Sequence, residues 1–382
     1  MTMETLSYQV SFATPAFLGN AEQQAQWRTP PFKALLRQWW RVAYAANEKF
    51  SVNVASMRRE EGLLFGHAWL GDDHDLRGQK VAARRSLVRI RLDSWEPGKL
   101  KAWPGDTVVP HPEVPNAVGS QLYMGYGPLE YKKGIGTALK ANAAIQAGET
   151  ATFSIAMPEG HAALIEQALA LMTRYGAVGG RSRNGWGSFA LLPLGDRQAV
   201  VSVTPLRPWR DALTMDWPHT LGQDESGPLI WQTAPATDWK ALMKQLAIIK
   251  IGLRTQFKFP DEKPPHPQPL DRHWLSYPIT KHTTSAWKGG FRLPNSLRFK
   301  VRPTKEDPKR LIGVIFHVPC LPPTEFAPNR NAIARTWQLV HALLDELTKS
   351  SNTRGYDSII DAQRRAKLKP QLDTVSLSRI LE

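Results

Sequence analysis

The sequence predicts an α+β fold in two domains, and three features of the chain indicate it. At 382 residues with 42% hydrophobic content, the chain is long enough to fill two cores. Short segments of alternating apolar and polar residues, typical of strands, are interspersed with longer segments whose apolar residues recur at helical spacing. Stretches rich in proline and glycine separate them. We expect one domain over residues 1–204 and a second over 205–382.

The first domain is expected to open with a strand at 7–12. A helix follows from Phe32 to Phe50, a segment without Gly or Pro in which Leu35 and Trp39 lie on the buried face. Further elements are predicted in this order: a strand at 86–92, an inserted loop or hairpin at 97–119, a strand at 149–157, a helix at 161–175, and a glycine-rich loop that leads into a strand. This order of strands and helices is that of a ferredoxin-like (RRM-like) domain with inserted loops.

The second domain repeats the same kinds of element, so we expect a second ferredoxin-like domain. The predicted elements are a strand near 200–208, a helix at 237–249, a proline-rich insertion at 259–270, strands near 273–280, 296–302 and 311–319, and a helix at 330–349. The tail from Ser350 carries a cluster of basic residues, Arg364, Arg365, Lys367 and Lys369. We expect this tail to be an ordered helix only when it is docked.

The net charge limits the class of partner. The chain carries a formal charge of +15, of which +5 falls in residues 1–204 and +10 in 205–382. Such a field concentrates polyanions, so nucleic acid is the leading ligand class. No run of eighteen apolar residues and no apolar leader are present, so we expect a cytoplasmic protein that does not bind membranes. The single cysteine, Cys320, excludes an intrachain disulfide and any multi-cysteine metal site.

Two basic patterns are candidate RNA contacts. Lys33, Arg37 and Arg41 are spaced four residues apart on one helix stripe, where they could meet a phosphate backbone. In the basic run 288–310, alternation predicts a strand whose core face carries Phe299 and whose outer face carries Arg298, Lys300 and Arg302. The alternative is an edge strand whose charges only oppose aggregation.

The loop GGRSRNGWGSF at 179–189 is the most informative segment. Its glycines, Gly179, Gly180, Gly185 and Gly187, permit positive φ and close approach to another chain. Arg181 and Arg183 add charge, and Trp186 adds a face on which a base could stack. An RNA backbone is the expected occupant, and the alternative is a tight turn that feeds a strand.

This loop resembles the glycine-rich loop of the RAMP superfamily, the ferredoxin-like subunits of CRISPR RNA-guided complexes. Four further segments resemble, in order and spacing, the first subunit of the Cmr module: FATPAFLGN at 12–20, RTPPFKALLRQWWR at 28–41, EEGLLFG at 60–66, and QLYMGYGPLEYKKG at 121–134. Family members usually carry two glycines where this chain has Gly19-Asn20, and Lys-Gly where it has Lys33-Ala34. The resemblance covers roughly residues 12–190.

The resemblance implies an RNA-binding structural subunit of a type III CRISPR effector complex. Such a subunit has two ferredoxin-like domains and sits at one end of a filament of backbone subunits. It helps to hold the 3′ part of the guide RNA and to capture the target RNA, while another subunit cleaves the target. The implied partners are guide RNA, target RNA and other RAMP subunits, with no cofactor.

A catalytic alternative stays open, because other RAMP proteins are metal-independent endoribonucleases that process guide RNA with a histidine acid or base. His67, His74 and His161 are the residues to test for it. GDDHD at 71–75 superficially resembles a metal-binding pair, but no second ligand set accompanies it. No G-x-S-x-G elbow and no P-loop occur. We therefore expect no catalytic residues, no metal and no nucleotide-hydrolysing activity.

Overall fold

The computed structural model describes residues 2–22, 24–68, 70–196, 203–287 and 289–380. The chain forms two compact units that are not contiguous in sequence. The first unit comprises Met1–Lys101, Ala141–Gly180 and Gly187–Pro205, and the second comprises Ala102–Lys140, Arg181–Trp186 and Leu206–Glu382. These units differ from the expected domains, 1–204 and 205–382, in three places: residues 102–140 and 181–186 belong to the second unit, and Pro205 belongs to the first.

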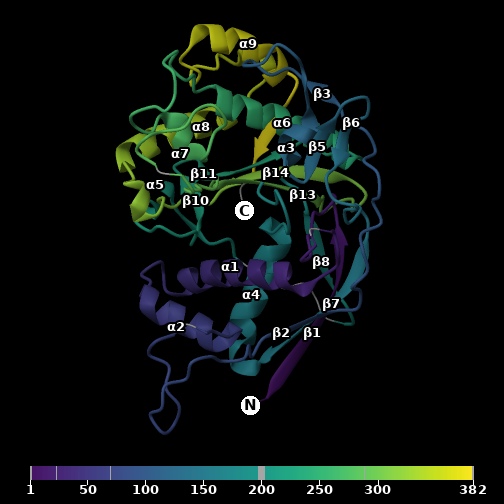
Figure 1. Ribbon diagram of the computed structural model, residues 1–382, viewed down its shortest axis with the longest axis vertical. Helices are drawn as coiled ribbons and strands as arrows, with labels where there is room; N and C mark the ends of the chain where they lie inside the picture. The colour runs from purple at the N-terminus through teal and green to yellow at the C-terminus, as the bar shows by residue number, and fades with distance from the viewer. Residues whose placement is uncertain (1, 23, 69, 197–202, 288, 381–382) are drawn as a thin grey trace. The chain divides into compact units, whose positions relative to one another are not determined.

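The first unit is built on a four-stranded antiparallel sheet in the order β2-β7-β1-β8. Its strands are β1 (Met3–Phe12), β2 (Arg89–Leu92), β7 (Thr150–Pro158) and β8 (Phe189–Pro193). Its helices are α1 (Thr29–Asn47), α2 (Val54–Phe65) and α4 (Ala162–Tyr175), with the 3-10 turn η1 (Glu159–His161). In Figure 1 these strands lie side by side, with α1 and α4 crossing next to them. The chain order and the strand order together are those of a ferredoxin-like domain.

The core of the first unit lies between the sheet and its helices. Phe32 of α1 contacts Phe153 of β7 and Phe189 of β8, with ring centroids 5.7 and 5.4 Å apart. Alternate residues of β7 are buried, as the period-two pattern predicts. Helix α1 begins at Thr29, earlier than expected, because Pro30 and Pro31 occupy its first turn, where a missing N–H costs nothing.

The second unit contains a four-stranded antiparallel sheet in the order β13-β14-β12-β15. Its elements follow the same pattern: β12 (Ile230–Thr233), α6 (Trp239–Thr255), β13 (Leu297–Pro303), β14 (Leu311–His317), α8 (Arg330–Glu346) and β15 (Leu377–Arg379). This confirms the predicted second ferredoxin-like fold. Figure 1 shows α6 and α8 beside β14, on the same side of it as α9 (Ala362–Leu372), which contacts α6.

Smaller elements complete the second unit. They are β3 (Val108–Val109), β4 (Val118–Gly119), α3 (Ser120–Gly125), β5 (Leu129–Lys132), β6 (Gly136–Leu139), β9 (Leu206–Pro208), α5 (Trp209–Ala212), β10 (Leu221–Asp224), β11 (Gly227–Pro228), α7 (Asp271–Leu275), η2 (Thr324–Phe326) and η3 (Ser351–Thr353). The hairpin β3–β4 lies within the predicted insertion at 97–119. Helix α3 and strand β3 both pack on α6.

Three element predictions need correction. The predicted strand near 273–280 begins instead as the short helix α7, whose side chains pack into an aromatic cluster around Trp287. The tail contains not only a helix, α9, but also β15, which pairs with β12 and completes the sheet. The strand expected near 200–208 is observed at Leu206–Pro208, and its residues 200–202 lie outside the described residues.

Candidate nucleic-acid interface

The glycines of the loop at 179–189 are required by the protein's own backbone. Gly179 and Gly187 have φ of +90° and +64°, values that favour glycine. A Cβ at Gly179 would lie 2.6 Å from the carbonyl oxygen of Phe17, and one at Gly187 would collide with the carbonyl oxygen of Val178. The tight-turn interpretation therefore explains these two glycines without any ligand.

The tip of the loop, residues 181–186, is held by the second unit. The guanidinium of the exposed Arg181 donates from Nε to the carbonyl oxygen of Tyr126, at 2.6 Å. Asn184 donates from Nδ2 to the carbonyl oxygen of Met124, at 2.7 Å. The amide of Phe299 on β13 donates to the carbonyl oxygen of Arg183, at 3.0 Å. These bonds fix the position of both arginines.

Trp186 is not the exposed stacking face that the sequence suggested. Its side chain is 0% exposed and packs edge-on against Trp103 and Trp239, with ring centroids 5.5 and 5.7 Å away. A large aromatic ring gains more from burial than from exposure, and the second unit supplies two more rings to bury it. Trp186 therefore anchors the loop and cannot stack on a base in this conformation.

Four cations from different segments gather around the loop tip, and we name Arg181, Lys250, Arg254 and Arg272 the basic cluster. Lys250 of α6 donates from Nζ to Oδ1 of Asn184, at 2.7 Å, and lies over the ring of Tyr123. Burial, with Arg254 and Arg181 nearby, lowers the pKa of Lys250 well below 10.5. Desolvation and then Arg254 also lower the pKa of Arg272 on α7. The cluster is thus dense enough for its charges to repel one another.

Acidic residues offset only part of this charge. Nη1 of Arg272 lies 2.6 Å from Oε1 of Glu113, which Nη2 of Arg364 on α9 also approaches at 3.5 Å. Within the described ranges, Arg181, Lys250 and Arg254 form no ion pair. A site with this balance favours an anion, because bringing a negative charge in relieves the repulsion.

Unused hydrogen-bonding groups support the same conclusion. Nε of Arg254, Nε of Arg272 and Oη of Tyr123 are buried and have no hydrogen-bond partner in the part of the chain that the structure describes. Leaving a buried donor unsatisfied costs about 1–3 kcal/mol. Phosphate oxygens are acceptors that would suit such donors.

A family model described as RAMPs, the RAMP superfamily, matches residues 10–190. Residues 10–190, just under half of the chain, are thus similar to the RAMP superfamily. The match covers the helices and the strands β2 and β7 of the first unit, with only the end of β1 and the start of β8. It also includes the segment 121–134 and the glycine-rich loop, which carried the sequence resemblance.

Comparisons with other proteins add two distant structures. The crystal structure of Cmr1 from Pyrococcus furiosus (apo form) is 15% identical in sequence, with a TM-score of 0.37, over 83% of this chain and 88% of that one. A chain of a Type IV-B CRISPR complex is 16% identical, with a TM-score of 0.28, over 56% of this chain and 100% of that one. No curated protein matches the chain.

The basic stripe of α1, which lies in the RAMP region, is partly neutralised. Arg37 and Arg41 each place Nε 2.8 Å from a carboxylate oxygen of Glu61, a buried residue of α2. Burial and then Arg37 lower the pKa of Lys33. The sequence prediction missed this pairing because it did not identify α2. Asn53, a residue type that favours the N-cap position, could have indicated the start of this helix, and its side chain accepts a hydrogen bond from the amide of Ser56.

The expected outward face of the basic strand is wrong for two of its three residues. Arg298 and Lys300 on β13 are 9% and 0% exposed, and Arg302 is half-buried. Burial lowers the pKa of Arg298 to about 9 and that of Lys300 well below 10.5. Alternation identified the strand and its two faces, but both faces of β13 are covered between Leu297 and Val301.

The histidines considered for catalysis have structural surroundings. Nε2 of the buried His67 lies 2.8 Å from Oδ2 of Asp73, which also binds Arg84. Nδ1 of His74 lies 3.0 Å from the carbonyl oxygen of Asp72 in an exposed turn. Throughout the described residues, no group of three His, Cys, Asp or Glu side chains is placed to hold a metal ion. No helix among them is long and apolar enough to cross a membrane.

Proposed function

We propose that this chain is an RNA-binding structural subunit of a type III CRISPR effector complex, similar to the first subunit of the Cmr module. In this proposal it acts in the cytoplasm with other RAMP subunits, helps to hold the 3′ part of the guide RNA, and captures target RNA without cutting it. The match of residues 10–190 to the RAMP superfamily supports this context. The basic cluster is the observation that carries the RNA-binding role.

The loop tip supplies the exposed part of the RNA site. Arg181 is exposed, and the neighbouring Tyr126, whose carbonyl oxygen it binds, is 66% exposed. Tyr131 on β5 is 68% exposed, and Lys132 follows it. Exposed tyrosines beside cations are the usual means of binding single-stranded RNA, because bases stack on the rings while the cations bind phosphates. Tyr126 and Tyr131 thus take the stacking role first assigned to Trp186.

The other predicted contacts remain part of the proposal in a reduced form. Lys33, Arg37 and Arg41 would add phosphate contacts through the N–H groups that Glu61 does not occupy. Arg302, half-buried at the end of β13, would add another. The four glycines would act indirectly, by holding the loop that presents Arg181 and Arg183.

The test is a titration of a fluorescent single-stranded RNA against the full chain at several salt concentrations. Arg181→Ala together with Tyr126→Ala should weaken binding at least about tenfold, since a stacking contact alone is worth about 1–3 kcal/mol. Arg77→Ala, in an exposed loop of the first unit, removes the same charge and is the matched control. Equal affinities for the double variant and the control would contradict the proposed site.

A reconstituted complex tests the capture role. The affinity for target RNA should fall when the chain is left out, because a contact made within an assembly is effectively intramolecular. Incubation of the isolated chain with repeat-containing RNA in EDTA separates this proposal from the ribonuclease alternative. Cleavage that His67→Ala, His74→Ala or His161→Ala abolishes would favour the ribonuclease.

A further inference from the structure

A second feature of the second unit, apart from the basic cluster, is a pocket of about 170 Å³. Its walls come from the segment 292–298 that leads into β13, the segment 318–323 that follows β14, and helix α8. Arg183 of the loop tip also lines it. The pocket therefore collects residues from both basic segments that the sequence singled out, the glycine-rich loop and the run at 288–310.

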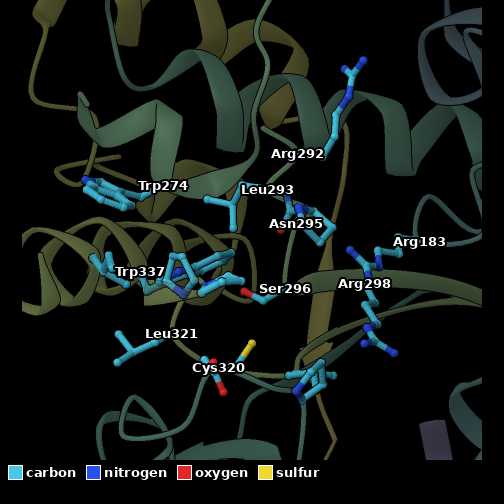
Figure 2. Close-up of a pocket in the computed structure, with 17 residues that line it drawn as sticks. Arg183, Trp274, Arg292, Leu293, Asn295, Ser296, Arg298, Cys320, Leu321 and Trp337 are labelled. Atoms are coloured by element: carbon cyan, nitrogen blue, oxygen red, sulfur yellow. The ribbon is translucent and has the colours of Figure 1, made fainter. Parts of the chain in front are cut away.

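The pocket has an apolar end and a cationic end, as Figure 2 shows. Trp274, Trp337 and Leu321 lie on one side of the view, and Arg183 and Arg298 lie together on the other. Ser296 lies between the two groups. A ligand that fills this space must combine a flat apolar part with an anionic part.

The cationic end favours a phosphate. Arg183, Arg292 and Arg298 line the pocket together with one acidic residue, Asp216. In Figure 2 the side chains of Arg183 and Arg298 lie together, and that of Arg292 points away from them. Burial and then the adjacent Arg183 lower the pKa of Arg298 to about 9. An anion between the guanidinium groups of Arg183 and Arg298 would offset this repulsion and accept charge-assisted hydrogen bonds from their N–H groups.

The size of the pocket favours a single ring. A cavity of about 150 Å³ in another protein binds benzene, so a pocket of about 170 Å³ in all has room for one six-membered ring, while the bicyclic ring of a purine is larger. Pyrimidine bases have one ring and purines two. Tryptophan and proline side chains suit the faces of such a ring.

Ser296 can recognise the polar edge of a pyrimidine. Its Oγ lies 3.0 Å from Nε2 of the buried His317, whose Nδ1 lies 3.0 Å from Nε2 of His341. Burial keeps both imidazoles neutral by lowering their pKa values, to about 3 for His341. When His317 is protonated on Nδ1, Ser296 donates to Nε2 and its oxygen accepts from the ligand. With the other tautomer, Ser296 donates to the ligand. Uracil donates a hydrogen bond at N3 and cytosine accepts one there, so Ser296 can bind either base by a change of the His317 tautomer.

We propose that this pocket receives one unstacked pyrimidine nucleotide of the bound RNA, with its base at the apolar end and its phosphate between Arg183 and Arg298. The proposal rests on the proposed RNA-binding function. It adds a preference for a base type, which a phosphate-binding surface alone would lack.

The first measurement uses free nucleotides and the full chain. UMP and CMP should bind more tightly than AMP and GMP, by about tenfold, the discrimination that a hydrophobic pocket provides against an oversized group. Leu321→Trp, which fills the apolar end, should abolish the preference. Leu192→Trp on the exposed surface of the first unit is the matched control and should leave it unchanged. Ser296→Ala should lower the affinity for both pyrimidines.

The second measurement uses a single-stranded RNA with 4-thiouridine at successive positions, irradiated in complex with the protein. Crosslinks should map to residues 292–298 or to 318–323, a segment that contains Cys320. In Leu321→Trp the crosslink yield should fall about tenfold, while the total affinity for RNA should fall less. If Leu321→Trp binds RNA with unchanged crosslinks and base preference, the pyrimidine pocket is contradicted and the proposed RNA-binding function is not. If the wild-type chain binds no RNA, both proposals are contradicted.

Discussion

The two units have the same strand order but arrange their charges differently. In the first unit three arginines have acidic partners: Arg37 and Arg41 share Glu61, and Arg84 binds Asp73. In the second unit, the basic cluster shares Glu113 between Arg272 and Arg364 and leaves the remaining cations unpaired among the described residues. The ion pairs of the first unit therefore offset part of its positive charge, whereas the basic cluster of the second unit favours an anion.

This difference teaches that the fold does not assign the function. A βαββαβ unit positions its helices in the same way in both cases, but the residues on the inserted segments decide which charges meet. In the second unit these inserted segments are 102–140 and 181–186.

The largest effect is expected from the buried tryptophans. Trp39 in the first unit and Trp186 in the second are 1% and 0% exposed, so replacement by alanine should destabilise the respective unit by about 3–5 kcal/mol. Hydrogen exchange should report the loss in the unit concerned. Under folding conditions only Trp186→Ala should also weaken RNA binding, because it releases the loop tip. Equal loss of RNA binding in the two variants would erase the contrast between the units.

Acidification should weaken the second unit before the first. His341 and His317 have lowered pKa values, to about 3 for His341, so between pH 6.5 and 3 the unfolded chain binds more protons than the folded one. Stability conferred by the neutral imidazoles is complete above pH 6.5 and falls with pH, by roughly 1 kcal/mol per pH unit for His341. Asp73 in the first unit, with a pKa of about 2, loses its contribution only below its ordinary value of 3.8.

The measurement is hydrogen exchange or chemical unfolding at pH 7, 6, 5 and 4. His341→Gln should flatten the dependence for the second unit, while His74→Gln in an exposed turn of the first unit should not. If, as the pH falls, the first unit loses hydrogen-exchange protection before the second, the proposed role of the buried histidines in the pH dependence would be contradicted.

A smaller difference in stability between the units is expected when the carboxylate that pairs with the arginines is replaced in each of them. Glu113→Gln should cost about 1.5–3 kcal/mol, since it weakens a charge-assisted hydrogen bond to the buried Arg272. Glu61→Gln is the matched change in the first unit. Polyanions such as heparin should raise the melting temperature of Glu113→Gln more than that of Glu61→Gln, because only the second unit is then left with a larger excess of cations. An equal response to heparin in both variants would argue against an anion site.

The smallest effect concerns single arginines, Arg181 in the second unit and Arg37 in the first. Arg181→Ala should reduce the slope of log affinity against log salt by about 0.7, the value for one lost phosphate contact on a single strand, with little change in melting temperature. Arg37→Ala should reduce it less, because Arg37 is already bonded to Glu61. A larger reduction for Arg37→Ala than for Arg181→Ala would move the main RNA site to the first unit.

Short-range sequence patterns were sufficient to predict the local elements and the resemblance to the RAMP superfamily. The alternation in β1, β7 and β14 and the helical spacing in α1, α4 and α8 are short-range patterns, and each is found close to its expected position. The order of these elements was sufficient to predict two ferredoxin-like folds. The glycine-rich loop was recognisable because its φ values and its contact with Phe17 require glycine at fixed positions.

Only the tertiary structure decided which side chains meet. Trp186, Arg298 and Lys300 have the composition of a nucleic-acid surface, but their burial depends on segments distant in the sequence, and no local pattern records it. Lys250 and Arg254 stand one helical turn apart on α6 without any motif, yet the fold brings them to Arg181, some seventy residues away along the chain. The physical reason is that periodicity fixes the direction of a side chain relative to its own element, whereas charge and burial depend on what long-range packing places opposite it.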